Sequence, residues 1–245
     1  MNSARACWRA GCVLAHVLAG LLHIVLLFPR LSAAQRDLRV QVWASRLLRR
    51  LGVELTLSGT PPLVGPMLLV ANHISWLDIP VLHAARHCRF VSKSDVKHWP
   101  LVGVLASGAG TLFIERESRR DAMRVVHRMS QALQDENILA IFPEGTTGDG
   151  TALLPFHANL IQAAISAHAP IQPVALRFID GRTGAPSQAM SYIGDESLLG
   201  SVWRTLCATR IRAVVSYGAP QLAAGRDRRT WARDLHAEIA RMLGC

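Results

Sequence analysis

The chain has 245 residues, 50% hydrophobic and 6% aromatic, with a formal net charge of +10 at pH 7. This composition excludes a disordered chain and suits one hydrophobic core with an extra segment. The positive charge favours anionic partners such as lipid headgroups, phosphorylated metabolites or acidic carrier proteins. Nucleic acid is not an expected partner, because the sequence carries no recognised nucleic-acid-binding motif. Five cysteines without C-x-x-C spacing indicate free thiols in a reducing compartment.

The first expected element is an uncharged apolar run from Cys12 to Phe28. As a helix it would be about 26 Å long, barely enough to cross a hydrocarbon core of about 30 Å. His16 and His23 share one face of this helix. Such a polar stripe suits a helix that lies at the headgroups or packs against another helix.

A second helix is expected in the arginine-rich stretch that follows, which contains Arg30, Arg36, Arg39, Arg46, Arg49 and Arg50. The residues that share its apolar face are Val40, Trp43, Leu47 and Leu51. An apolar helix followed by a basic amphipathic one is typical of a membrane-surface segment. The heavier basic load after the apolar run also predicts that the main domain lies on the cytoplasmic side.

A cleavable signal peptide is the competing interpretation of this segment. The apolar run follows Arg5 and Arg9 and precedes "LSAAQ", which resembles a cleavage site. Arg30 lies between the run and that site and argues against cleavage. We therefore expect a membrane anchor with a basic amphipathic helix in residues 1–54, and an α/β domain in residues 55–245.

Beyond Pro61, apolar runs with strand character alternate with helical patterns. The expected strands are Met67–Ala71, Arg89–Ser92, Thr111–Ile114, Ile138–Phe142, Ile171–Leu176 and Ala213–Tyr217. The expected helices are Leu77–Arg86, Arg119–Asp135, Ala158–Ala167 and Arg229–Leu243. This alternation predicts an α/β fold, in which helices flank a mostly parallel sheet. It leaves the strand order open.

Two finer expectations concern the first two of these helices. Ser75 and Ser118 are candidate N-caps, because a serine side chain can accept a hydrogen bond from the first turn of a helix. The residues expected on the buried face of the second helix are Met123, Val126, Met129 and Leu133.

The segment "VANHISWLDIP" (70–80) places His73 and Asp78 between a strand and a helix. Five positions on a regular helix are about 140° apart, so the two side chains meet only if His73 precedes the helix and Asp78 lies in its first turn. His73 then stands at the carboxyl edge of the sheet, where open α/β sheets build their sites. A carboxylate on one ring nitrogen fixes the tautomer and makes the other nitrogen more basic, as a general base requires. The alternative is that the spacing of His73 and Asp78 arises by chance. Residues at the ends of the neighbouring strands distinguish between the two interpretations.

Charged residues also follow three other expected strands. Lys93 follows Arg89–Ser92, and Arg116 ends "TLFIER". The strand at 138–142 runs into Pro143-Glu144-Gly145-Thr146, where the glycine lets a ligand approach the backbone. One base, two cations and a glycine turn at one sheet edge predict a site for an anion and a hydroxyl group. For Arg116 a solvated strand end is the alternative.

Four blocks of the chain carry a family resemblance, namely Asn72-His73 through Asp78, Gly110–Arg116, Phe142–Thr146 and Ile171–Leu176. In order and spacing they resemble the four blocks of the glycerolipid acyltransferases, above all the 1-acyl-sn-glycerol-3-phosphate acyltransferases of the bacterial PlsC type. The resemblance extends from roughly residue 55 to residue 217, and four blocks in order are far more specific than one. Membership would also imply a two-helix membrane motif at the N-terminus.

The resemblance implies direct acyl transfer to a hydroxyl group. His73, oriented by Asp78, would deprotonate the acceptor hydroxyl, which attacks an acyl thioester without forming an acyl-enzyme. The thioester, acyl-CoA or acyl carrier protein (acyl-ACP), would be a co-substrate, and neither a cofactor nor a metal is implied. Arg116, with Lys93, would hold the acceptor's phosphate. The other residues assigned to substrate binding are Asn72, Glu144, Gly145 and Thr146.

The sequence departs from the family pattern at Thr147, where most members carry a basic residue. A similar Thr-Thr-x-Asp-Gly run is associated with the branch that acylates lyso-ornithine lipids. This departure argues against a phosphate-bearing acceptor but not against the reaction type. The resemblance as a whole implies 1-acyl-sn-glycerol-3-phosphate as acceptor, giving phosphatidic acid for phospholipid biosynthesis, with lyso-ornithine lipid or another lysophospholipid as the alternative. Either reaction implies a bacterial inner membrane protein with its catalytic domain on the cytoplasmic face.

Three other interpretations are weaker. His83 and His87 lie one helical turn apart, but the sequence suggests no third metal ligand. A thioesterase or lipase usually needs a nucleophile, and the sequence has no G-x-S-x-G motif. A non-catalytic membrane-surface binding protein would not need a base with an orienting acid.

Overall fold

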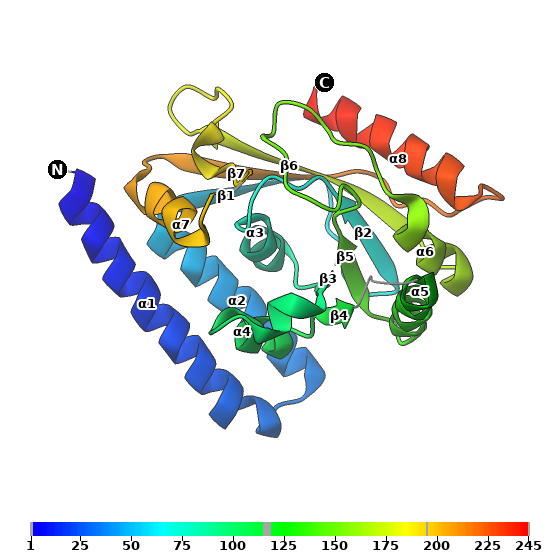
Figure 1. The fold of residues 1–245 in the computed structure, drawn as a ribbon, viewed down its shortest axis with the longest axis horizontal. Helices are drawn as coiled ribbons and strands as arrows, with labels where there is room; N and C mark the ends of the chain where they lie inside the picture. The colour runs from blue at the N-terminus through cyan, green and yellow to red at the C-terminus, as the bar shows by residue number, and fades with distance from the viewer. Residues whose placement is uncertain (1, 115–118, 195, 245) are drawn as a thin grey trace.

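The computed structural model of the chain describes residues 2–114, 119–194 and 196–244. One mixed sheet forms the centre of the molecule, and helices cover both of its faces (Figure 1). The expectation of an α/β fold with helices on both faces of a mostly parallel sheet is confirmed.

The described strands form a sheet in the order β1-β7-β6-β2-β5-β3-β4. Their bounds are β1 (Val53–Ser58), β2 (Met67–Ala71), β3 (Arg89–Lys93), β4 (Leu112–Ile114), β5 (Ile138–Ile141), β6 (Ile171–Asp180) and β7 (Ile211–Tyr217). Neighbouring strands run parallel except β6 and β7, which pair antiparallel. The six strands expected from the sequence are therefore present. β1 was missed, although its alternation of apolar and polar residues is a strand signal.

The two central strands β2 and β5 read as continuous apolar runs because they are buried on both faces. In β2, Leu68 and Val70 contribute to one hydrophobic cluster, whereas Met67, Leu69 and Ala71 contribute to the other. Each residue of β2 therefore packs into one of the two clusters, whichever face of the sheet it points to. This burial fixes β2 firmly, and the candidate base follows it directly.

The helices are α1 (Asn2–Leu26), α2 (Ala33–Leu51), α3 (Asp78–Ala85), α4 (Val102–Gly108), α5 (Arg119–Gln134), α6 (Gln162–Ala167), α7 (Leu198–Cys207) and α8 (Arg228–Leu243). Short 3-10 helices are η1 (Phe28–Arg30), η2 (Ser94–His98), η3 (Ala158–Ile161) and η4 (Gln188–Met190). Buried residues of α5, α6 and α8 form one core cluster, and those of α2, α3 and α7 belong to the other. The sequence analysis missed α4 and α7.

Two finer expectations were wrong. Met123 on α5 is 74% exposed and Val125 lies in the core in its place, although Met129 and Leu133 are buried as expected. Ser75 is not the N-cap residue of α3, which is Leu77. The Ser75 hydroxyl nevertheless accepts a hydrogen bond from the Leu77 backbone N–H at 3.2 Å. Ser118 lies outside the described residues.

The N-terminal helices α1 and α2 pack against each other beside the sheet (Figure 1). The imidazole of His16 is buried, stacks on the Trp43 ring at 5.0 Å and bonds to the Trp43 carbonyl group. Of the two environments expected for His16, lipid headgroups or a neighbouring helix, the structure shows the neighbouring helix. The α1 residues Arg5 and Arg9 donate to the carbonyl groups of Cys207 and Leu206, at the end of α7. The α1 helix is thus tied to α7.

The opposite side of α1 is apolar and uncovered. Its large exposed residues are Trp8, Leu14, Leu18, Leu22, Val25 and Leu26. Within the described residues, α1 is the one helix long and apolar enough to cross a membrane by length and composition. Only 11% of its most apolar window is buried.

Candidate active site

The turn between β2 and α3 carries His73, as the spacing predicts. β2 ends at Ala71, and α3 begins at Asp78, so the two side chains can meet across the turn. Nδ1 of His73 lies 2.8 Å from Oδ2 of Asp78. The same oxygen accepts the backbone N–H groups of Ile74 at 2.6 Å and Ser75 at 2.9 Å. Asp78 therefore holds both the imidazole and the backbone that carries it.

The tautomer of His73 follows from these contacts. Because the carboxylate oxygen accepts, Nδ1 carries the proton and Nε2 keeps its lone pair. The His73 side chain is 19% exposed, whereas Asp78 is fully buried. Asp78 thus holds one ring nitrogen from inside, and within the part of the chain that the structure describes nothing hydrogen-bonds to the other, which is the geometry that a general base requires.

Phe142 holds the plane of the imidazole. Its ring stacks on His73 with a centroid distance of 4.0 Å and an interplanar angle of 6°. Phe142 in turn stacks on Phe90 of β3 at 5.7 Å. The base is thus confined by a carboxylate in its plane and by a ring on its face.

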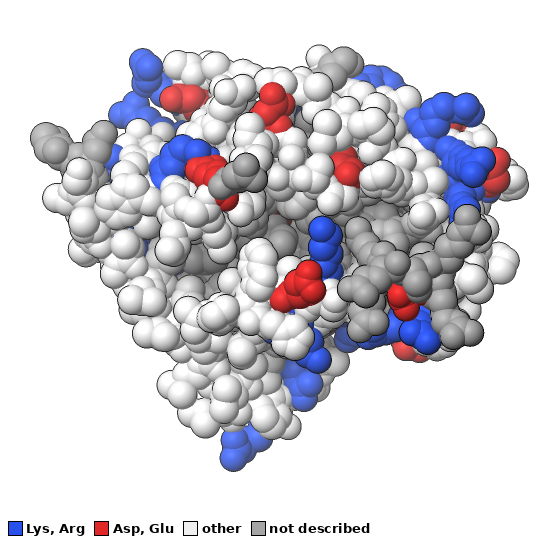
Figure 2. Space-filling view, in the orientation of Figure 1, with Lys and Arg blue, Asp and Glu red and all other residues white. Residues whose placement is uncertain are grey.

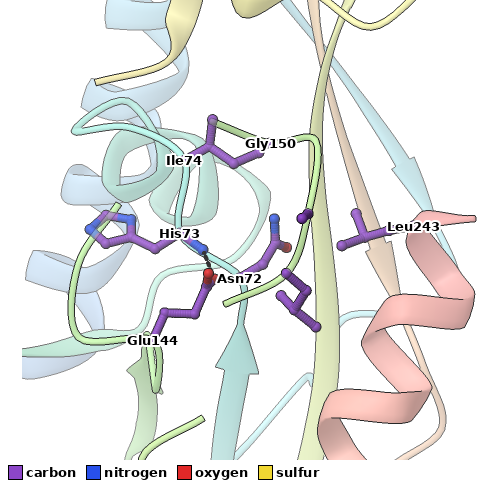
Figure 3. A pocket seen from close by; sticks show the side chains of 8 residues that line it. Asn72, His73, Ile74, Glu144, Gly150 and Leu243 are labelled. Carbon is purple, nitrogen blue, oxygen red and sulfur yellow. Dashed lines mark hydrogen bonds between the residues drawn. The ribbon is translucent and has the colours of Figure 1, made fainter. Parts of the chain in front are cut away.

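Glu144 binds the backbone of the base. Its Oε1 accepts the His73 N–H at 2.7 Å (Figure 3), and its Oε2 accepts the Leu154 N–H at 2.9 Å. The residue is buried, and burial raises the pKa of Glu144 against the backbone hydrogen bonds that lower it. Both carboxylate oxygens have protein partners, so the side chain ties three segments of the site together.

Asn72 points away from the imidazole of His73 (Figure 3). Its amide nitrogen donates to the Leu176 carbonyl at 3.0 Å, and its oxygen accepts the Leu176 N–H at 2.7 Å. The side chain thereby continues the pairing of β2 with β6 beyond Ala71. This geometry favours a positioning role, and the substrate-binding role expected for Asn72 stays a prediction.

The other residues expected to bind substrate follow β3 and β5, or lie outside the described residues. Lys93 is the exposed last residue of β3, two strands from β2 in the sheet. Gly145 adopts a φ of 72°, which favours glycine, and Gly145 and Thr146 are both exposed just after β5. Arg116 lies outside the described residues. Its role in holding an anion stays a prediction.

A small pocket opens behind the base, lined by Asn72, His73, Ile74, Glu144, Gly150, Ala152, Leu153 and Leu243. In Figure 3 the imidazole of His73 points away from Gly150 and Leu243, which close the far side of this pocket. Substrates that meet Nε2 would therefore approach from the other side of the ring.

A second group of residues, which no sequence motif predicted, surrounds this turn. The Tyr192 N–H donates to the Ile74 carbonyl at 3.1 Å, and the Ser191 hydroxyl donates to the Asp149 carbonyl at 3.0 Å. The indole N–H of Trp76 donates to the Ser201 hydroxyl on α7 at 3.1 Å. The serine N-cap and amphipathic pattern of α7 could have revealed that helix. The Tyr192 and Ser191 contacts end on backbone carbonyl groups, which no residue type in the sequence marks.

The His83–His87 pair proves to be a packed pair. The rings stack at 5.1 Å, and His87 Nε2 lies 3.1 Å from Asp37 of α2. Burial lowers the pKa of His83 to about 3. Within the described residues, no group of three or more His, Cys, Asp or Glu side chains could hold a metal ion.

Comparisons with known proteins agree with this geometry. The family model described as Acyltransferase matches residues 34–177, which is more than half of the chain. A lyso-ornithine lipid O-acyltransferase of Pseudomonas aeruginosa is 40% identical over 197 residues, covering 80% of this chain and 75% of that protein. A 1-acyl-sn-glycerol-3-phosphate acyltransferase of Neisseria gonorrhoeae is 37% identical over 177 residues, covering 72% of this chain and 69% of that protein.

A solved structure shows the same fold. The crystal structure of the 1-acyl-sn-glycerophosphate (LPA) acyltransferase PlsC from Thermotoga maritima superposes with a TM-score of 0.70 at 15% sequence identity. The match covers 99% of this chain and 96% of that one. With the family resemblance of the sequence thus confirmed, the chain belongs to the Acyltransferase family and is an acyltransferase of the PlsC type.

Proposed function

We propose that the chain is a membrane-associated O-acyltransferase that moves a fatty acyl group from an acyl thioester to the free hydroxyl of a lysolipid. The observation that carries this proposal is the His73–Asp78 pair, in which Nδ1 is held at 2.8 Å and no described residue hydrogen-bonds to Nε2. The names of the relatives from Pseudomonas and Neisseria support a lysolipid as the acceptor class.

In the proposed reaction, Nε2 of His73 takes the proton of the acceptor hydroxyl as its oxygen attacks the thioester carbonyl carbon. The tetrahedral intermediate collapses by breaking the carbon–sulfur bond, and the leaving thiolate takes the proton from the imidazolium. Asp78 stabilises the imidazolium that forms between these steps. No acyl-enzyme is needed, because the lipid hydroxyl is itself the nucleophile.

The proposed binding residues are those that end the strands around the base. Lys93 and Arg116 would neutralise an anionic headgroup or the donor's phosphates, and Gly145 and Thr146 would let the acceptor reach the backbone. The pairing of Glu144 with two backbone N–H groups supports a positioning role for that carboxylate. Its expected acceptor-binding role stays a prediction.

Two acceptors fit the proposal. The first is 1-acyl-sn-glycerol-3-phosphate, whose phosphate suits the proposed cations. The second is lyso-ornithine lipid, whose headgroup carries no phosphate. It is supported by Thr147, which stands where a cation would be expected and whose hydroxyl bonds to the Tyr192 carbonyl. Acyl-CoA and acyl-ACP remain the two candidate donors.

Membrane association would explain the uncovered apolar side of α1. A broad face over α1 and α4 shows few charged side chains in Figure 2, and Trp99, Leu101 and Val104 add exposed apolar groups there. Lipid acceptors reside in the membrane, so an apolar face on this side of the molecule would bring the site to its substrate. We propose that the protein lies at the cytoplasmic face of a bacterial inner membrane.

An acceptor panel tests the proposal. The purified protein is given labelled acyl-CoA or acyl-ACP with 1-acyl-sn-glycerol-3-phosphate, other lysophospholipids or lyso-ornithine lipid, and the lipid products are separated. We expect label in a diacyl product with at least one acceptor. Release of free fatty acid alone would favour a thioesterase, and binding to liposomes without thioester consumption would favour a non-catalytic lipid-binding protein.

A further inference from the structure

We propose that Arg204 of α7 is a positioning residue for acyl transfer, acting on His73 through residues 189–192. The inference rests on the function proposed above, because it assigns a role at the same site. Among the described residues, Arg204 bonds to Ala189, Ser191 and Glu196, none of which is expected to bind substrate, and not to the imidazole. Its effect would pass through the backbone contacts of the 189–192 segment.

The guanidinium of Arg204 gathers this segment onto α7. Nη1 and Nη2 donate to the two carboxylate oxygens of Glu196 at 2.6 and 2.9 Å, a bidentate ion pair. Nε donates to the Ala189 carbonyl at 3.0 Å, and Nη2 also donates to the Ser191 carbonyl. A planar guanidinium can serve an acid and two carbonyl groups at once, which an ammonium group cannot do in the same geometry.

The segment held in this way contacts both halves of the active site. The Tyr192 N–H donates to the Ile74 carbonyl at 3.1 Å, directly after the base. The Tyr192 carbonyl accepts the Thr147 hydroxyl, and the Ser191 hydroxyl donates to the Asp149 carbonyl at 3.0 Å. The segment therefore bridges the turn after β2 and the turn after β5.

One further bond closes the ring of contacts. The Gly148 N–H donates to the carbonyl group of His73 itself at 2.8 Å. His73 is then held through its own carbonyl by the 147–149 turn, and that turn is held by the 189–192 segment. Arg204 is the charged group from which this chain of contacts begins.

The helix beneath Arg204 is anchored independently. Ser201 is fully buried and accepts the Trp76 indole N–H, while Thr205 and Leu206 lie in the core. The Arg204 side chain itself is 42% exposed. Substitution at this position should therefore loosen the backbone at residues 189 and 191, while Met190 stays buried in the core and α7 stays in place.

The predicted kinetic effect follows from the geometry of the reaction. Direct transfer requires the acceptor oxygen within about 3 Å of both Nε2 and the thioester carbon, and a misplacement of about 1 Å costs on the order of 100-fold in rate. Loosening the two turns should lower kcat. The affinity for the thioester should change little, because none of these contacts is with groups proposed to bind it.

The test compares Arg204→Gln and Arg204→Lys with the control Arg212→Gln. Arg212 on β7 forms a partly exposed ion pair with Glu54 on edge strand β1, at 3.2 Å, and contacts no part of the site. Each variant is assayed for kcat and KM with the acceptor that the parent uses, and its Tm is measured. We expect Arg204→Gln to lower kcat by about tenfold or more, with KM for the thioester within about twofold. Arg204→Lys should recover part of the loss, and the control should match the parent.

A second variant keeps the proposal testable if Arg204→Gln folds poorly. Thr147→Val removes the hydroxyl that binds the Tyr192 carbonyl at nearly constant volume, and should also lower kcat more than KM. Parent-like kcat in either folded variant would overturn the proposal, as would an equal loss in Arg212→Gln. A parent without activity toward any lysolipid would instead contradict the proposed function, so the two failures are distinguishable.

Discussion

Asp78 is the residue on which the orientation of the candidate base depends, since one of its oxygens accepts three hydrogen bonds. Replacing it with Asn keeps the size but allows an amide N–H₂ group to face Nδ1, which would favour the wrong tautomer of His73. We predict a loss in kcat of about 10² to 10⁴-fold, within the range of general acid–base contributions. Asp234→Asn is the control, because Asp234 lies on α8 and pairs with Arg226, which precedes that helix. Equal activity of Asp78→Asn and the control would contradict the assigned role.

His83 makes a pH-dependent contribution to stability. Its pKa is about 3 in the folded chain, because burial disfavours the charged form, and about 6.5 when the chain is unfolded. Between these values the unfolded state binds more protons, so stability rises with pH across this window and is lost on acidification. At pH 5 the penalty is about 2 kcal/mol relative to pH 7.

His83→Gln removes this titration while keeping a polar side chain. We predict that the difference in unfolding free energy between pH 7 and pH 5 becomes smaller in the variant than in the parent. Denaturant unfolding at both pH values measures it. An unchanged difference would show that His83 is not buried as a neutral group.

The junction between β2 and β6 depends on the Asn72 amide, which satisfies both backbone groups of Leu176. Asn72→Ala leaves a buried N–H and a buried carbonyl group unpaired, at a cost of about 1 to 3 kcal/mol each. We predict a lower unfolding free energy, with KM values for the substrates near those of the parent in the folded fraction. A stable variant with a raised KM would restore the substrate-binding role expected from the sequence.

The exposed apolar side of α1 leads us to predict that this helix contacts the membrane. Leu18 and Leu22 lie one turn apart on that side and are 51% and 57% exposed. The double variant Leu18→Asp/Leu22→Asp places two charges where the membrane is expected and should weaken sedimentation with anionic liposomes by about tenfold or more. Met123→Asp on α5 is the control, because Met123 is also exposed but lies on another side of the fold. Unchanged binding by the double variant would exclude α1 as the contact surface.

Across the whole molecule, the features that the sequence predicted well are those set by neighbouring residues in the chain, such as single strands and the turn after β2. The apolar run of β2, the short turn and the start of α3 together placed His73 beside Asp78, because all three lie within about a dozen residues. Helix faces were less certain, as Met123 shows, because neighbouring apolar positions allow more than one orientation of α5 and tertiary packing selects one.

The contacts that the sequence did not predict join residues far apart in the chain, and most of them involve backbone groups. The antiparallel direction of β7 is set by its pairing with β6, which apolar periodicity does not encode. Tyr192 reaches Ile74 through an N–H group that every residue except proline possesses, so no residue type marked it. Arg204 was not distinguished from the other arginines for the same reason, since its acceptors are two carbonyl groups and one acid.

The most direct measurement is acyl transfer by His73→Ala, compared with His127→Ala, which removes an exposed histidine of α5. Both proteins are given a labelled acyl thioester with the acceptor that the parent uses, and the labelled diacyl lipid is quantified. The account predicts parent-like transfer by His127→Ala and a loss of at least about 10²-fold by folded His73→Ala. Near-normal transfer by His73→Ala would contradict a mechanism in which this imidazole deprotonates the lipid hydroxyl.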